Sequence, residues 1–254
     1  MLGDRSTLGL RAGVAFVWLA TGVLVLHPTY REIGLAELAR VPGLAGAGWL
    51  MWATCAFEIA LGVTVLLARA ATWLTVLQVG MIATFTLILS VADPMLLVSP
   101  FGVLTKNVPI VSCLGVAWLV ERRGWSERAL WMLRVGVGVI WFTEGLMPKW
   151  LFQQPIELAI AARTVPFLAP STALHVIGTV QIAGGVLALT LRGAPLRLVL
   201  LAQAAALVVL AGVMTFVDAS LWAHPFGPLT KNAPILMGTL VARARLASGK
   251  KEGA

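Results

Sequence analysis

The chain alternates between long apolar segments and short polar connections. The longest segments run for more than 20 residues with at most one charged side chain. A helix needs about 20 apolar residues to cross the ~30 Å hydrocarbon layer of a membrane. We therefore expect eight transmembrane helices, at 12–26, 44–68, 71–92, 104–120, 129–147, 171–191, 194–217 and 229–241.

Two longer connections, 27–43 and 148–170, follow the first and fifth expected spans. Both are moderately apolar and contain prolines, a pattern that favours loops or short helices lying on the membrane surface. The fourth and eighth spans are short, so we expect them to tilt little or to begin inside the interface.

An eleven-residue string occurs twice. Residues 100–110 read PFGVLTKNVPI and residues 225–235 read PFGPLTKNAPI, with nine identical positions at an offset of 125. The same offset relates Asp93 to Asp218 and Gln78 to Gln203. Polar residues that recur in register through an apolar background indicate a tandem duplication.

The duplication predicts two units, 1–123 and 124–254, each with four spans. Because four is even, the two copies enter the membrane in the same direction and are parallel repeats. The expected fold is an all-α integral membrane protein of eight transmembrane helices. Its two parallel four-helix bundles would be related by a pseudo-twofold axis along the membrane normal.

Composition supports membrane residence. Hydrophobic residues make up 59% of the chain and charged residues only 12%, which is too few to cover a soluble protein of this length. The net charge of +8 comes from basic residues scattered singly between apolar spans, without a basic face, so nucleic-acid binding is excluded.

The same basic residues predict the orientation. One side of the expected topology carries thirteen Lys and Arg residues and the other carries six, which are Arg31, Arg40, Lys106, Lys149, Arg163 and Lys231. The positive-inside rule then places both termini in the cytoplasm, with the protein in the cell membrane. The two repeated strings lie on the outer face.

Cysteine and histidine provide no metal-site pattern. Cys55 and Cys113 lie inside apolar spans, without a CxxC pair or a nearby histidine, so no zinc or iron–sulfur signature exists. The three histidines, His27, His175 and His224, do not recur at matching positions, which argues against haem ligation by two histidines.

Lys106 and Lys231 are the unusual residues of the repeated string. Each is expected at the start of a helix, where a cation opposes the helix dipole. Three arrangements would offset this cost: an ion pair with Asp93 or Asp218, an extended side chain that reaches lipid phosphate, or a ligand held together with the helix N–H groups.

The repeated Asn107 and Asn232 follow the lysines directly and are candidates for the same ligand site, as is His224. Glu58 and Glu144 are carboxylates expected within spans. Each is either a protonated group bonded between helices or a proton-exchanging contact to a ligand. Gln78 and Gln203 are expected to bond neighbouring helices.

At these residues the chain resembles the DoxX-like membrane proteins. The second half carries the string HPFGPLTKN at 224–232, EGLMPK at 144–149 and PIEL at 155–158, and the first half carries EIALG at 58–62. The first half lacks the Pro-Lys feature and has Ser99 where the family shows histidine. The resemblance covers almost the whole chain as two four-helix units.

The resemblance implies a link to membrane redox systems. We expect an accessory or ligand-binding membrane component, with a quinone, a lipid or an oxidoreductase subunit as partner. No residue set here performs redox chemistry unaided, which weighs against an enzyme. The alternatives are a small transporter with a path between the repeats and a non-catalytic scaffold. The candidate ligand-binding residues are Lys231, Asn232, His224, Asp218, Lys106, Asn107, Asp93, Glu144 and Glu58.

Overall fold

The computed structural model describes residues 2–99 and 105–248, and this part of the chain is helical without strands. Eight helices are long: α1 (Leu2–Leu24), α3 (Gly48–Leu67), α4 (Thr72–Ala92), α5 (Asn107–Arg123), α6 (Glu127–Leu146), α8 (Pro170–Thr190), α9 (Gly193–Val217) and α10 (Asn232–Ser248). Two are shorter, α2 (Pro28–Arg40) and α7 (Pro155–Thr164). Three single turns complete the fold: η1 (Pro94–Leu97), η2 (Met147–Leu151) and η3 (Ala219–Ala223).

Six of the eight expected spans are confirmed as helices long and apolar enough to cross a membrane, namely α1, α3, α4, α6 (continued by η2), α8 and α9. The helices α5 and α10 each have 17 residues. At ~1.5 Å per residue they extend for only about 26 Å. The count of eight membrane-crossing helices is therefore not established. The short helices α2 and α7 occupy the two proline-containing connections, as expected.

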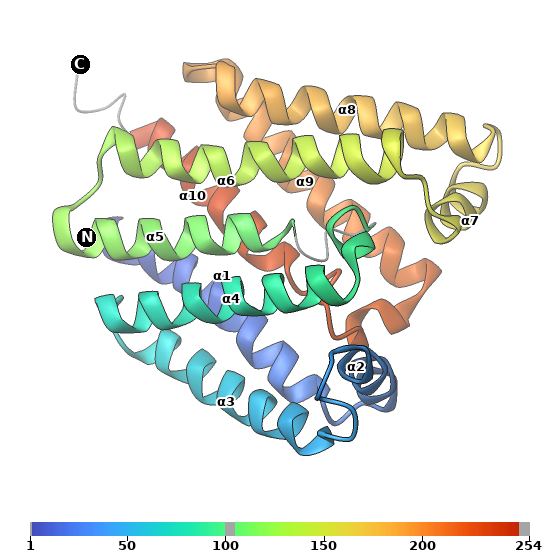
Figure 1. The fold of residues 1–254 in the computed structure, drawn as a ribbon. Coiled ribbons are helices and arrows are strands. Elements are labelled where there is room, and N and C mark those ends of the chain that lie inside the picture. Colours follow the sequence, from blue (N-terminus) through green and yellow to red (C-terminus); the bar gives the residue numbers. More distant parts are fainter. Residues whose placement is uncertain (1, 100–104, 249–254) are drawn as a thin grey trace.

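Helices α1, α5, α6 and α10 form the centre of the bundle and contact one another in a ring. Outside them, α3 packs on α1 and α8 packs on α6, while α4 and α9 pack on α5 and α10. The elements α1–α5 and α6–α10 thus repeat one arrangement. The start of α1, the α5–α6 connection and the end of α10 lie at one end of the molecule, and α2 and α7 lie at the other (Figure 1).

Glycines allow α1 to lie close against α3, and α6 close against α8. A Cβ atom at Gly145 would lie 2.5 Å from the carbonyl oxygen of Gly178, and one at Gly22 would lie 2.7 Å from that of Cys55. Close backbone approach at small residues is a characteristic way for helices to associate in membranes, where apolar burial does not drive them together. Gly22 and Gly145 are equivalent positions of the two repeats.

Repeated arginines cap the helices that these glycines contact. Arg11 donates to the carbonyl oxygens of Val65 and Leu66 at the end of α3. Arg134, its counterpart, donates to Ala188, Leu189 and Leu191 at the end of α8. A cation at a helix C-terminus satisfies orphan carbonyls and is stabilised by the helix dipole. These arginines thus have a structural role besides their contribution to topology.

Buried and exposed apolar residues are distributed as a membrane protein requires. Leu10, Leu133 and Ile235 are almost fully buried where the two repeats meet. Large apolar side chains are exposed on the outer helices, such as Val91 of α4 and Phe216 of α9, which is 96% exposed. Water would disfavour that exposure and lipid does not, so the chain is an integral membrane protein.

The two repeated glutamines bond neighbouring helices, as expected. Gln78 accepts a 3.0 Å hydrogen bond from the Trp18 indole, and Gln203 donates one of 3.0 Å to the Gly184 carbonyl. Cys55 and Cys113 are both free and buried.

Candidate ligand-binding site

In each repeat, a partly open cavity lies between the outer helices and the centre of the bundle. The cavity of the second repeat has a volume of about 170 Å³ and lies among α6, α7, α8, α9 and α10. The cavity of the first repeat has a volume of about 270 Å³ and lies among α1, α2, α3, α4 and α5. Apolar side chains form most of both walls, and a few polar groups converge in each, which is the usual composition of a small-molecule site.

The lysines of the repeated string are exchanged between the repeats. Lys106 of the first repeat lines the second-repeat cavity, beside Asn232. Lys231 of the second repeat lines the first-repeat cavity, beside Asn107. Each cavity therefore combines the asparagine of its own repeat with the lysine of the other, and neither is complete without both halves of the chain.

The exchange arises where the two strings pass each other before α5 and α10. Lys106 is only 7% exposed and donates a 2.6 Å hydrogen bond from Nζ to the carbonyl oxygen of Pro228, in the second string. Thr105 donates a 2.9 Å hydrogen bond to Oε1 of Glu144 on α6. The first string is thus bonded to two elements of the second repeat.

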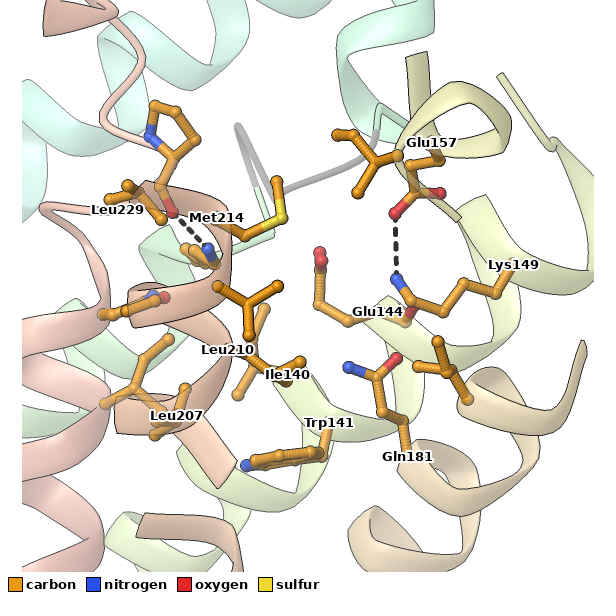
Figure 2. Close-up of a pocket in the computed structure, with 18 of the residues that line it drawn as sticks. Ile140, Trp141, Glu144, Lys149, Glu157, Gln181, Leu207, Leu210, Met214 and Leu229 are labelled. Atoms are coloured by element: carbon orange, nitrogen blue, oxygen red, sulfur yellow. Dashed lines mark hydrogen bonds and ion pairs between the residues drawn. The ribbon is translucent and has the colours of Figure 1, made fainter. Parts of the chain in front are cut away.

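Two carboxylates and two lysines surround the second-repeat cavity. Figure 2 shows the Glu144 carboxylate directed into the cavity, with the pair of Lys149 and Glu157 beside it. Lys149 Nζ lies 3.1 Å from Glu157 Oε1 and also donates to the Glu144 backbone carbonyl at 3.1 Å. Side-chain exposure is 10% for Lys149 and 7% for Glu157, so this ion pair is largely shielded from water.

The break at the end of α6 positions Lys149. Pro148 lacks the amide hydrogen that would continue an α-helix, and the chain instead forms the π-type turn η2. Such wide turns inside or beside α-helices are frequent at functional sites. The turn packs on α8 and leaves both Pro148 and Lys149 buried, and Lys149 lines the second-repeat cavity.

Three oxygens that belong to residues lining the second-repeat cavity have no hydrogen-bond partner among the described residues. They are Glu157 Oε2, Gln181 Oε1 and Asn232 Oδ1. A buried polar atom without a partner costs about 1–3 kcal/mol. These three oxygens are therefore available to a molecule that enters the cavity.

The first-repeat cavity has a different polar set. Glu58 on α3 is 7% exposed, forms a side-chain hydrogen bond with Thr21, and leaves Oε2 without a partner among the described residues. The Tyr30 hydroxyl lies 3.6 Å from Cys55 Sγ on the same wall. No counterpart of the Lys149–Glu157 pair exists here, because Leu26 and Gly34 occupy those positions.

Comparison with known proteins agrees with this duplicated architecture. The family model of the DoxX-like family matches the chain twice, at residues 15–115 and 138–240. The chain belongs to the DoxX-like family. Each match lies within one of the two expected units, and together they cover most of the chain. No curated protein and no solved structure matched the chain in the other two comparisons.

Six of the nine candidate residues of this DoxX-like protein line a cavity. Lys106, Glu144 and Asn232 meet in the second-repeat cavity. In the first-repeat cavity, Lys231, Glu58 and Asn107 meet. Sequence reasoning had grouped each lysine with its own repeat, and this grouping is wrong because the two strings cross.

The three remaining candidates line neither cavity. Asp93 caps η1 by accepting from the Met95 amide and pairs with Arg40 at 3.4 Å. Asp218 is exposed and accepts two hydrogen bonds from Ser220 at the start of η3. Among the described residues, neither aspartate forms an ion pair with Lys106 or Lys231, so this one of the three arrangements considered for the lysines is not found.

The His224 side chain forms a hydrogen bond within its own turn. Its Nδ1 accepts a 3.3 Å hydrogen bond from the Phe226 amide, and the two rings lie tilted against each other. Burial, with Lys231 nearby, lowers the pKa of His224 below its ordinary range. A neutral imidazole suits this accepting role. Residues 100–104 of the first repeated string lie outside the described part of the chain.

Sequence reasoning did not nominate Lys149, Glu157 or Gln181 for the site. A signal was present, because the Pro-Lys and Pro-x-Glu-Leu features of the family contain Lys149 and Glu157. Glu157 lies on α7, outside the membrane-spanning helices, and burial raises its pKa above the ordinary range although Lys149 opposes this shift.

Proposed function

We propose that this DoxX-like protein binds the head group of a neutral, membrane-soluble ligand of the quinone class in its second-repeat cavity. In this proposal the protein is an accessory membrane component of a redox system. The supporting observation is the set of unpartnered oxygens on Glu157, Gln181 and Asn232 beside two lysines. A head group that both donates and accepts hydrogen bonds suits such a mixed set.

Shape and charge favour the same ligand class. Sites for complete drug-sized molecules typically enclose ~300–1,000 Å³. The cavity of about 170 Å³ suits a single ring, with a tail lying between helices among side chains such as Leu207, Leu210 and Met214. Two lysines and two glutamates give the lining no formal net charge, which favours a neutral head group over a fully charged one.

The residues of this site would bind the ligand and exchange its protons. Lys106 and Lys149 would donate hydrogen bonds to ring carbonyl oxygens. When the reduced ligand loses two protons and two electrons, Glu144 would accept one proton and water would accept the other. The electrons would pass to a partner subunit that carries a flavin or a metal. In this proposal the protein lies in the plasma membrane with eight crossings and cytoplasmic termini, as the basic residues predict.

A transport path between the repeats is less well supported. The space between the central helices is filled by buried apolar side chains such as Val14, Val137 and Ile235. The cavities lie toward the outer helices instead, one on each side. This arrangement favours binding of separate ligands over passage of one substrate along the interface.

Titration of the protein in nanodiscs with a short-chain ubiquinone, and with its quinol form that carries O–H donors, tests the proposal. We expect saturable quenching of tryptophan fluorescence that falls in Trp141→Phe, because Trp141 lines the cavity. Lys106→Met and Gln181→Leu should each weaken binding about tenfold, as expected for one lost hydrogen bond to a buried group. The matched control is Arg123→Gln, an exposed position at the other end of α5.

The proposal fails if the quench does not saturate. It also fails if Trp141→Phe, Lys106→Met and Gln181→Leu all bind like the unchanged protein.

A further inference from the structure

One carboxylate organises the end of the first repeat where the chain termini lie. Glu121, in the last turns of α5, forms ion pairs with Arg11 at 3.2 Å and with Arg69 at 3.9 Å. Its second oxygen accepts a 2.7 Å hydrogen bond from the Ala70 amide, in the connection between α3 and α4. The first repeat therefore has a built oxyanion position with two guanidinium groups and a backbone N–H around it.

The second repeat keeps the cationic surroundings and lacks the carboxylate. Arg11, Arg69 and Ala70 correspond to Arg134, Arg192 and Gly193 at an offset of 123. Glu121 corresponds to Leu246, at the offset of 125 that relates α5 to α10. An apolar side chain thus stands where the neutralising anion would be expected.

A cleft of about 800 Å³ occupies this place, and Arg134, Arg192, Gly193 and Leu246 all line it. Arg134 is only 9% exposed and donates through Nε and NH2 to the end of α8. Its NH1 nitrogen has no hydrogen-bond partner among the described residues, whereas the NH1 of Arg11 binds Glu121. Arg134 thus lines the cleft while its NH1 donor remains unused.

We propose that this cleft binds an oxyanion, the phosphate of a phospholipid head group, in place of the carboxylate that the second repeat has lost. Among the described residues that line the cleft, Arg128 is a third arginine and Glu127 is the one carboxylate, so their formal charge is positive. Trp131 lines the same cleft with its ring near Arg134, and aromatic side chains are common at the level of lipid head groups. This site is independent of the quinone cavity, which lies toward the other end of α6.

The test measures phospholipid retained by the full-length protein after purification in a mild detergent, with native mass spectrometry as the readout. We expect phosphatidylglycerol to bind more tightly than phosphatidylcholine, because only the first carries a net negative charge. Arg192→Gln should weaken this binding about tenfold through loss of a charge-assisted hydrogen bond. Arg123→Gln, an exposed change of equal charge at the same end of the molecule, should leave it unaltered.

Leu246→Glu gives the sharper result. It restores the carboxylate found in the first repeat, so the variant should fold and should lose phosphatidylglycerol binding. A second measurement adds inorganic phosphate to lipid-free protein and records the thermal unfolding midpoint. If phosphate raises the thermal midpoint of lipid-free protein and not that of Leu246→Glu, the site stands and a soluble oxyanion can fill it. Equal phosphatidylglycerol retention by the unchanged protein, Arg192→Gln and Leu246→Glu would overturn the proposal.

Discussion

The ammonium group of Lys106 donates a 2.6 Å hydrogen bond to the carbonyl oxygen of Pro228, so the two copies of the repeated string are in direct contact. This contact joins the first repeat to the second at the point where each contributes a lysine to the other's cavity. Stability measurements on variants of Gly145, Arg134 and Glu157 would check the fold around this contact, and cysteine labelling would check the orientation of the molecule in the membrane.

Gly145→Ala should destabilise the protein by about 1–3 kcal/mol, as overpacking at a tight contact usually does. The added methyl group would lie 2.5 Å from the Gly178 carbonyl oxygen, so α6 and α8 must move apart. Gly80→Ala is the matched control, because a Cβ atom there meets nothing within 4 Å. Unfolding in detergent should show a loss for the first variant only. Equal midpoints for both would contradict the close helix contact.

Arg134→Met should cost ~3 kcal/mol, because hydrogen bonds from a charged group to the end of α8 disappear. Arg134→Lys should recover only part of this loss, since an ammonium group cannot span the carbonyls that the guanidinium reaches. Arg123→Met, at an exposed position, serves as the reference. If Arg134→Met unfolds at the same midpoint as Arg123→Met, the capping role is wrong.

Glu157→Gln should change how stability depends on pH. Because burial raises the pKa of Glu157, the folded protein holds a proton that the unfolded chain has released once the pH passes the ordinary value of 4.5. Stability from this group therefore falls as pH rises through that window, by at most about 1.4 kcal/mol per pH unit. Glu157→Gln removes the fall, so its stability relative to the unchanged protein should increase as the pH rises above 4.5.

The reference for this measurement is Glu32→Gln on α2, an exposed carboxylate without the buried surroundings of Glu157. Unfolding midpoints across the same pH range should run parallel for Glu32→Gln and the unchanged protein. A Glu157→Gln curve that also runs parallel would show that Glu157 carries no stability change with pH.

Cysteine labelling in intact cells should place the two ends of the molecule on opposite sides of the membrane. In a chain with Cys55→Ala and Cys113→Ala, the variant Arg163→Cys should react with an impermeant maleimide from outside. Arg123→Cys should react only after permeabilisation. Both positions are exposed, so accessibility does not limit the reaction. Labelling of both from the same side would refute the parallel arrangement.

The sequence was sufficient for the long helices and for their duplication. Apolar length alone identifies spans such as α4 and α9, because a membrane imposes one requirement on every crossing. The repeated string also drew attention to Lys106 and Lys231, and each of them lines a cavity. The capping role of Asp93 was not predicted, although Asp followed by Pro94 is a common helix start.

The crossing of the strings was not readable from the sequence. A repeat shows that two segments are alike, and it does not show which copy each side chain faces. That choice depends on how α5 and α10 pack at the centre, through contacts between residues more than 100 positions apart, such as Lys106 and Pro228. The pairing of Lys149 with Glu157 depended likewise on the direction that the turn at Pro148 gives the chain.

The crossed lysines bear on how such a protein can evolve. A duplicated gene normally frees one copy to drift while the other preserves the original role. Here each copy furnishes a cation to its neighbour's chamber, so a substitution in one string alters the chemistry of the opposite half. Loss of either half would therefore also take a lysine from the wall of the cavity that remains.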